Sequence, residues 1–130
     1  MQQIKVQTPA KINLTLEVLD KRKDGFHNIQ SIMQTISLSD FLTIKVSQSS
    51  RTENEIFLSG TSLEIPYDEK NIVFKATKLY LDFAKITNTK INIFIEKNIP
   101  VCAGLAGGST NASGALYGLN QIFQKLSHFE

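Results

Sequence analysis

The residues best suited to binding chemistry lie in a glycine-rich stretch at 100–112, which reads PVCAGLAGGSTNA. Its glycines allow backbone N–H groups to turn toward a ligand without an intervening Cβ. The polar run Ser-Thr-Asn at 109–111 adds hydroxyl and amide donors where a helix is expected to begin. A helix N-terminus also carries about half a positive charge. Together these features favour an anion-binding site, most often for a phosphate.

A plain strand-to-helix turn explains the same stretch about equally well. In that interpretation the glycines relieve strain, and Ser109 or Thr110 caps the helix. Two familiar phosphate motifs are excluded. No Lys follows the glycines, and Ala106 stands where G-x-G-x-x-G needs its second glycine.

Lys11 and Asn13 lie on the polar face of an expected strand. A lysine there could neutralise a phosphate or lower the pKa of a neighbouring hydroxyl or acid. Such a lysine is more often a solvated residue of a sheet edge, and the residue pattern by itself favours that interpretation.

A charged loop at 20–28 ends in Phe26 and His27, a pair that could stack on a nucleic-acid base or a nucleotide. The simpler interpretation is a hairpin turn with Asp24–Gly25 at its tip and Phe26 folded into the core. Without other evidence we favour the hairpin.

The one cysteine, Cys102, excludes a disulfide framework and a multi-cysteine zinc site, and it favours a reducing compartment. We expect it to be a small core side chain without a nucleophilic role. No His or carboxylate cluster has the spacing of metal ligands, so we expect no protein metal site.

Composition limits the class of protein. The 130 residues, 42% hydrophobic and 20% charged, suit one globular domain and exclude disorder. A net charge of +2 is too small to indicate a nucleic-acid partner, and no apolar run is long enough for a membrane helix. No signal or transit peptide is visible at the N-terminus, so we expect a cytoplasmic protein.

Alternating apolar residues predict the strands that must position these groups. They fall at 4–6 and 12–18, with Pro9 marking an edge or a break, and at 30–38, 41–46, 55–58 and 91–95. A tight connection is expected at Ser39–Asp40.

Helical spacing predicts two helices. The first has Asp68 as its N-cap, and the second follows the glycines. Their apolar faces are expected to comprise Ile72, Val73, Ala76, Leu79, Tyr80 and Phe83 in the first helix, and Ala112, Ala115, Leu116, Leu119, Ile122, Phe123 and Leu126 in the second. The order of elements predicts an α+β fold, with helices on one face of a mainly antiparallel sheet.

Four stretches in this order resemble the GHMP kinase superfamily: PAKINLTL at 9–16, DGFH at 24–27, NIV at 71–73, and PVCAGLAGGSTNA at 100–112. The P-x-x-x-G-L pattern is shared across the superfamily. GGSTN, PAKINL and GFH are more specific, and are similar to the members that act on a diphosphocytidyl methylerythritol. The resemblance covers essentially the whole chain.

The resemblance implies a fold like domain 2 of ribosomal protein S5, with 1–130 forming the ATP-binding N-terminal domain. It also implies ATP-dependent phosphorylation of the 2-hydroxyl of 4-diphosphocytidyl-2-C-methyl-D-erythritol, a small molecule of bacterial non-mevalonate isoprenoid biosynthesis. ATP and Mg²⁺ are the expected cofactors. Neither a nucleic acid nor a membrane is an expected partner, and the oligomeric state is not indicated.

Roles carried over by position stay with the resemblance. Lys11 would assist the reacting hydroxyl, Asn13 would lie beside the substrate, and Phe26 and His27 would hold the cytosine. ATP would be bound by the remaining set, with Asn71 and Lys97 near the adenine: Pro100, Ala103, Gly104, Leu105, Ala106, Gly107, Gly108, Ser109, Thr110, Asn111, Asn71 and Lys97.

Two departures from the family pattern matter. Ala106 replaces a frequent glycine, and we expect it to be tolerated only at negative φ. The family's catalytic Asp lies in a Gly-Ala-Asp-Val-Pro stretch that no part of this sequence matches. The domain is therefore expected to be incomplete, to lack the C-terminal domain and to be inactive alone. The alternatives are another GHMP kinase, such as one acting on mevalonate or homoserine, and a non-catalytic module that binds RNA or protein.

Overall fold

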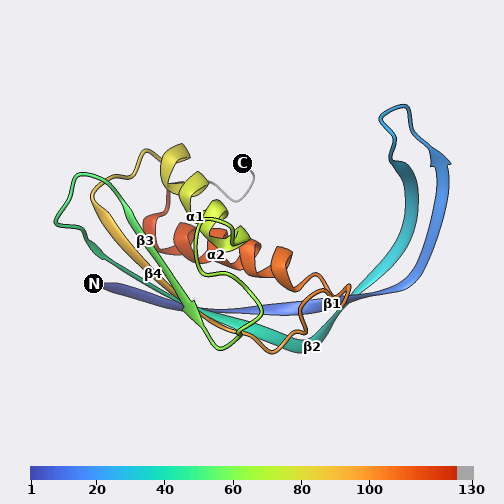
Figure 1. Ribbon diagram of the computed structural model, residues 1–130, viewed down its shortest axis with the longest axis horizontal. Helices are drawn as coiled ribbons and strands as arrows, with labels where there is room; N and C mark the ends of the chain where they lie inside the picture. The colour runs from blue at the N-terminus through green and yellow to red at the C-terminus, as the bar shows by residue number, and fades with distance from the viewer. Residues whose placement is uncertain (126–130) are drawn as a thin grey trace.

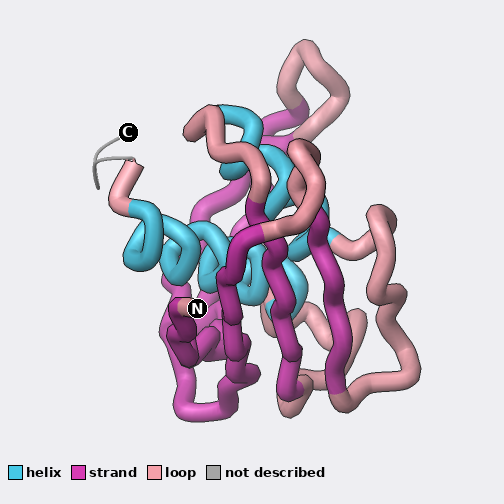
Figure 2. The backbone as a smooth tube through the Cα atoms, turned by 90° about the vertical axis from the view of Figure 1, so that its left-hand side faces the viewer, coloured by secondary structure: helices cyan, strands magenta, loops and turns pink. Residues whose placement is uncertain are grey.

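The computed structural model describes residues 1–125. The elements, in chain order, are β1 (Gln2–Lys21), β2 (His27–Gln48), β3 (Glu55–Gly60), α1 (Ile72–Phe83), β4 (Thr89–Glu96) and α2 (Gly107–Phe123). The strands form one sheet in the order β1-β2-β4-β3, in which only the β3–β4 pair is parallel. Both helices cover the same face of that sheet (Figures 1 and 2). The predicted α+β fold is confirmed.

The first two strands are longer than the sequence indicated. Pro9 marks an edge strand, as predicted, without ending β1, whereas the predicted connection at Ser39–Asp40 is absent. Pro9 pairs in register with Ser39, and β2 runs straight through Ser39–Asp40. Pro9 is tolerated because β1 is an edge strand, where one missing N–H does not interrupt a central ladder. The prediction of a tight connection at Ser39–Asp40 is wrong, because the Asp40 carboxylate finds buried partners inside the domain.

Beyond the body of the domain, β1 and β2 continue as a curved two-stranded arm comprising residues 11–38 (Figure 1). Its turn is the predicted hairpin: Gly25, at φ 91°, donates its N–H to the carbonyl of Arg22 at 3.1 Å. Phe26 does not fold into the core, since 72% of its surface is exposed. The arm has only two strands and no layer behind it to bury such side chains. Its other exposed apolar residues include Leu14, Leu16, Val18, Ile29, Ile32 and Met33.

The core lies between the sheet and the helices. β2 and β4 contribute Leu42, Ile44, Ile91, Ile93 and Ile95, and the helices contribute Val73, Leu81, Ala115 and Leu119. Burying side chains of this size is the main stabilising contribution to such a layer. The arm stays outside this cluster.

The first helix begins one turn later than Asp68 and is rotated from the predicted face. Its N-cap is Asn71, whose Oδ1 accepts the N–H of Val73 at 2.8 Å. Ile72, Leu79 and Phe83 are exposed, whereas Thr77 is fully buried and donates its hydroxyl to the carbonyl of Val73. Because that bond satisfies the hydroxyl, threonine occupies a position that an apolar pattern cannot reveal.

The second helix lies on the sheet through small residues. Gly114, Ala115 and Gly118 are buried, whereas the predicted core residue Leu116 is 38% exposed. A Cβ on Gly118 would come within 2.6 Å of Ile44 Cδ1, so glycine is needed there for close approach. Leu126, also predicted on this face, lies outside the described residues.

Candidate nucleotide site

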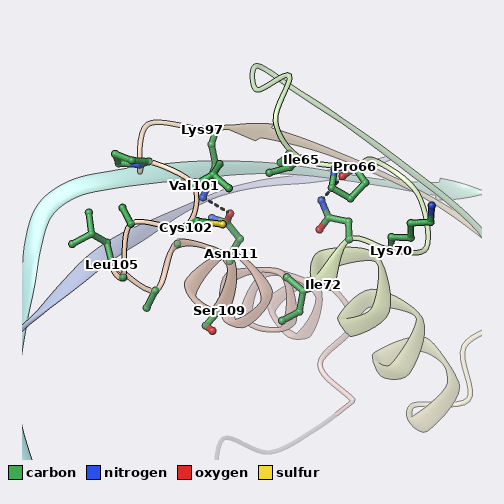
Figure 3. Close-up of a pocket in the computed structure, with 17 residues that line it drawn as sticks. Ile65, Pro66, Lys70, Ile72, Lys97, Val101, Cys102, Leu105, Ser109 and Asn111 are labelled. Carbon is green, nitrogen blue, oxygen red and sulfur yellow. Dashed lines mark hydrogen bonds between the residues drawn. The ribbon is translucent and has the colours of Figure 1, made fainter.

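A cavity of about 470 Å³ lies between the glycine-rich segment, the first turn of α2 and the start of α1 (Figure 3). Ile65, Pro66 and Ile72 line the side opposite the loop. The cavity brings together nearly all the predicted ATP-binding residues: Asn71, Lys97, Pro100, Ala103, Gly104, Leu105, Ala106, Gly107, Gly108, Ser109 and Asn111. Thr110 is the exception, because it lines a different groove, with Lys5 and Tyr117.

The backbone of this loop has a geometry suited to anions. Cys102, Gly104 and Ala106 adopt positive φ of 60°, 72° and 59°, whereas the two residues between them do not. A backbone whose φ alternates in sign can turn successive N–H groups toward one side, as in the concave anion sites formed by backbone amides. The helix that follows has no side-chain N-cap, so its first N–H groups remain for a ligand.

The sequence predictions for Ala106 and Cys102 are wrong. Ala106 sits at φ 59° and ψ 27°, although we expected negative φ. A non-glycine residue in this region costs about 1–2 kcal/mol. Cys102 is exposed in the loop instead of filling the core.

Lys11 contacts the loop from outside the cavity, across 93 residues of sequence. Its N–H donates to the carbonyl of Leu105 at 3.1 Å, and its Nζ to the carbonyl of Gly104 at 3.4 Å. The register of β1 shifts between Pro9 and Lys11. Such an irregularity disrupts the ladder locally and redirects backbone groups, and here the Lys11 N–H bonds to the loop. Lys11 is therefore not a plain solvated edge residue.

The predicted substrate residues lie along the arm, away from the cavity lining. Asn13 accepts a hydrogen bond from the Ser31 hydroxyl at 3.2 Å. Phe26 and His27 are exposed beside the hairpin turn at the far end of the arm. The path from Lys11 to that turn follows about ten residues, or roughly 30 Å of extended chain. The described structure does not bring these aromatic groups to the glycine-rich loop.

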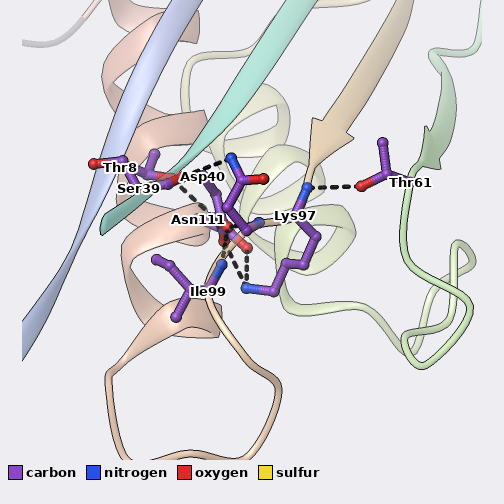
Figure 4. Close-up of polar contacts among 8 residues, drawn as sticks. Thr8, Ser39, Asp40, Thr61, Lys97, Ile99 and Asn111 are labelled. Atoms are coloured by element: carbon purple, nitrogen blue, oxygen red, sulfur yellow. Dashed lines mark hydrogen bonds and ion pairs between the residues drawn. The ribbon is translucent and has the colours of Figure 1, made fainter. Parts of the chain in front are cut away.

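A buried polar network lies under the loop (Figure 4). Lys97 Nζ is 2.6 Å from Asp40 Oδ2, and the side chains are 7% and 0% exposed. Asn111 Nδ2 donates to the same carboxylate oxygen at 2.9 Å and to the Thr8 hydroxyl at 3.0 Å. Lys97 also donates to Asn111 Oδ1 at 3.2 Å. The side-chain polar atoms of Lys97 and Asn111 are thus engaged within the protein.

Sequence reasoning missed Asp40 and Thr8. The only available signal was an acidic residue directly before the apolar run FLTIKV, which we interpreted as a turn. Asn71 is similarly engaged: its Oδ1 caps α1, and its Nδ2 donates to the carbonyl of Pro66 at 2.7 Å. It therefore shapes the cavity wall, while its amide is already bonded.

Burial by itself raises the pKa of Asp40, but hydrogen bonds outweigh that effect. The N–H of Ile99, the ammonium of Lys97, the amide of Asn111 and the N–H of Asn98 all donate to this carboxylate. Together they hold the pKa of Asp40 below its ordinary value of 3.8. The ionised form is thus the one that the fold stabilises.

Among residues 1–125 no three His, Cys, Asp or Glu side chains are grouped so that they could hold a metal ion. In the same described range, neither helix has the length and apolarity needed to cross a membrane.

Comparison with known proteins identifies the domain. The model of the GHMP kinases N terminal domain matches residues 71–130. A crystal structure of 4-(cytidine 5'-diphospho)-2C-methyl-D-erythritol kinase superimposes with a TM-score of 0.79 at 31% identity, covering 97% of this chain and 43% of that one. The chain carries a GHMP kinase N-terminal domain. A homoserine kinase from Cytophaga hutchinsonii shares the fold, with a TM-score of 0.71 at 20% identity over 97% of this chain and 37% of that one.

Curated relatives are more similar in sequence to this GHMP kinase domain. The chain is 50% identical over 121 residues to the 4-diphosphocytidyl-2-C-methyl-D-erythritol kinase of Clostridioides difficile (strain 630), covering 93% of the chain and 39% of that relative. It is 43% identical over 124 residues to the enzyme of the same name from Alkaliphilus metalliredigens (strain QYMF), covering 95% and 41%. The chain spans about two-fifths of the length of these relatives.

The buried ion pair predicts a defined pH dependence of stability. Because the native pKa of Asp40 is depressed, its contribution is complete above the ordinary pKa and is lost as pH falls through the native value. At pH 7, Asp40→Asn leaves Lys97 buried without its counter-charge and should lower the unfolding free energy by about 3 kcal/mol. That deficit should shrink as the pH falls below 3.8.

Urea unfolding of both proteins at pH 7 and at several acidic pH values measures the deficit. The exposed Asp20→Asn variant is the matched control and should change stability by less than about 0.5 kcal/mol. A deficit for Asp40→Asn that stays constant from neutral to acid pH would contradict the interpretation.

The strain at Ala106 predicts that glycine is better there. Ala106→Gly should raise the unfolding free energy by about 0.5–1 kcal/mol, because relief of the left-handed strain exceeds the added chain entropy of glycine. Ala112→Gly in α2 is the control, and it should instead lower stability by about 1 kcal/mol. Urea unfolding at pH 7 measures both, and equal losses in the two variants would show that Ala106 is not strained.

Proposed function

We propose that the protein to which this chain belongs phosphorylates the 2-hydroxyl of 4-diphosphocytidyl-2-C-methyl-D-erythritol with ATP. The observation that carries the proposal is the cavity of about 470 Å³ walled by the glycine-rich loop and by the uncapped N-terminus of α2. Its size suits a nucleotide, and its backbone N–H groups suit phosphates. The relatives at 43–50% identity carry the name of that kinase, which supports the choice of substrate.

In this proposal the backbone holds the ATP phosphates. Residues 104–109 would surround them, while Ile65, Pro66 and Ile72 offer an apolar wall to the adenine. Lys97 would support the wall through Asp40, since its ammonium is already paired. Phosphoryl transfer depends mainly on positioning and on stabilisation of charge, which a preorganised backbone site supplies.

Mg²⁺ would accompany ATP. In the described part of the chain no carboxylate lines the cavity, and the nearby Asp40 carboxylate is already engaged by four donors. Magnesium is commonly held by substrate phosphates with few protein ligands. We therefore place the ion on the phosphates, where it would neutralise their charge, and assign it no side-chain ligand in residues 1–125.

Lys11 would act on the acceptor side of the loop. Its ammonium already lies beside the carbonyl of Gly104, a residue that lines the cavity, although Lys11 itself is not among the lining residues. A cation there would stabilise negative charge on the attacking hydroxyl and on the transferred phosphoryl group. Asn13, next but one along β1, would contact the methylerythritol part.

Phe26 and His27 would hold the cytosine. The aromatic ring is 72% exposed and has no neighbouring layer to cover it, which is unusual for a side chain of this size. In the proposal its free face stacks on the base, and His27 offers a hydrogen-bonding edge. Reaching the phosphate loop from there would require an extended substrate or a bend of the arm.

The single cysteine gives a direct test of the nucleotide site. Cys102 is exposed in the loop and lines the cavity, so saturating MgATP should slow its alkylation several-fold. Cytidine diphosphate should not slow it. The matched control is a Cys102→Ser/Lys45→Cys protein, whose thiol would lie on an exposed position of β2 remote from the cavity lining and should react at the same rate with or without MgATP. Unchanged Cys102 reactivity at millimolar MgATP would contradict nucleotide binding.

The role of Lys11 is tested in a protein as long as the curated relatives, of which this chain spans about two-fifths. Lys11→Ala should reduce kcat by about a hundredfold or more, while the KM for ATP changes little, because the ammonium acts when charge develops. Lys5→Ala, an exposed lysine earlier on β1, is the control and should leave both constants near the parent values. A Lys11→Ala enzyme with unchanged kcat would remove this residue from the mechanism.

A further inference from the structure

One carboxylate, that of Asp40, is bonded at both ends of the glycine-rich loop (Figure 4). Its Oδ1 accepts the N–H groups of Asn98 and Ile99 at 2.6 and 2.7 Å, directly before Pro100. Its Oδ2 accepts Asn111 Nδ2 at 2.9 Å, in the second turn of α2. The loop between these anchors is the segment that walls the cavity.

We propose that Asp40 is a positioning residue that sets the shape of the anion-binding loop by fixing its two ends to the same strand. The inference rests on the proposed nucleotide site, because it concerns how that site is held ready. Asp40 does not line the cavity and would not touch ATP, so it acts through the loop.

The loop needs such a hold because its conformation is strained. Two non-glycine residues, Cys102 and Ala106, have left-handed backbones, and each such residue costs about 1–3 kcal/mol unless its surroundings over-determine it. Lys11 holds the middle of the loop through the carbonyls of Gly104 and Leu105. Asp40 holds both ends, so the loop is attached at its start, its middle and its end, and these three attachments define its path.

An ionised carboxylate is the side chain that fits this task. Four donors converge on Asp40: two backbone N–H groups, the Lys97 ammonium and the Asn111 amide. An ionised carboxylate offers acceptor sites on both oxygens, whereas an asparagine amide would turn its NH₂ group toward some of these donors. Lys97 supplies the charge that lets the carboxylate remain ionised at 0% exposure.

The contacts of the two Asp40 oxygens can be tested separately by substitution. Loss of the whole side chain in Asp40→Ala frees both ends of the loop, whereas Asn111→Ala frees only the α2 end and leaves the Asp40–Lys97 pair intact. Thr8→Val is the matched control inside the network, since it removes only the second acceptor of Asn111. Asp20→Asn is the control for loss of one negative charge.

The experiment measures amide hydrogen exchange along the 130-residue chain at neutral pH, together with protection of Cys102 by MgATP. In Asp40→Ala, amides of 97–111 should exchange at least about tenfold faster while those of β3 and of the arm keep their rates. In Asn111→Ala the increase should be confined to 106–111. The two controls should match the parent protein, and MgATP protection should be lost in Asp40→Ala.

The outcomes separate the two proposals. An increase in exchange rate spread evenly over all elements, or no increase in 97–111, would overturn the positioning role. The Asp40–Lys97 pair would then serve global stability alone. Faster exchange confined to 97–111, without MgATP protection of Cys102 in either the parent or the variant, would uphold the positioning role and contradict the nucleotide site. Should Asp40→Ala fail to fold, the Asn111→Ala pattern decides: a confined increase supports the proposal, and a uniform one overturns it.

Discussion

The structure depends on a carboxylate that is fully removed from water and must therefore be paired. Asp40 lies within β2 at 0% exposure, where an unpaired negative charge would be strongly destabilising. Lys97 at the end of β4 and Asn111 on α2 reach it from two further elements. Satisfying this one group links the middle of a long strand, the end of its neighbour and the start of a helix. The cavity lies beside this junction, between the glycine-rich loop, the first turn of α2 and the start of α1.

The same requirement accounts for the character of the candidate site. Side chains that could have contacted a ligand directly, Lys97 and Asn111, are instead used to complete the buried network. What remains for the ligand is mostly backbone, shaped by the positive φ angles of Cys102, Gly104 and Ala106. A site of this kind recognises an anion through N–H groups and a helix N-terminus, with a low demand for free cations.

The arm behaves differently from the body of the domain. Its two strands pair with each other, but no helix or further strand covers their faces, and apolar side chains from Leu14 to Met33 remain exposed. A two-stranded ribbon has little apolar burial to stabilise it. The contrast explains why the alternating pattern there, which normally indicates one buried face, predicts the strands correctly but not their environment.

Sequence by itself determined the elements that depend on local pattern and on identifiable motifs. These are the two helices, the strands predicted at 55–58 and 91–95, the hairpin at Asp24–Gly25 and the glycine-rich loop that lines the cavity. It failed where a residue's role depends on distant partners. Asp40 is typical of a turn when only its neighbours are considered. Donors 57 to 71 residues away, among them Lys97 and Asn111, satisfy its carboxylate inside a strand. Ala106 likewise adopts a backbone conformation that its own chemistry disfavours. Tertiary structure decided both, because buried charge and backbone strain are stable only when several elements converge on them.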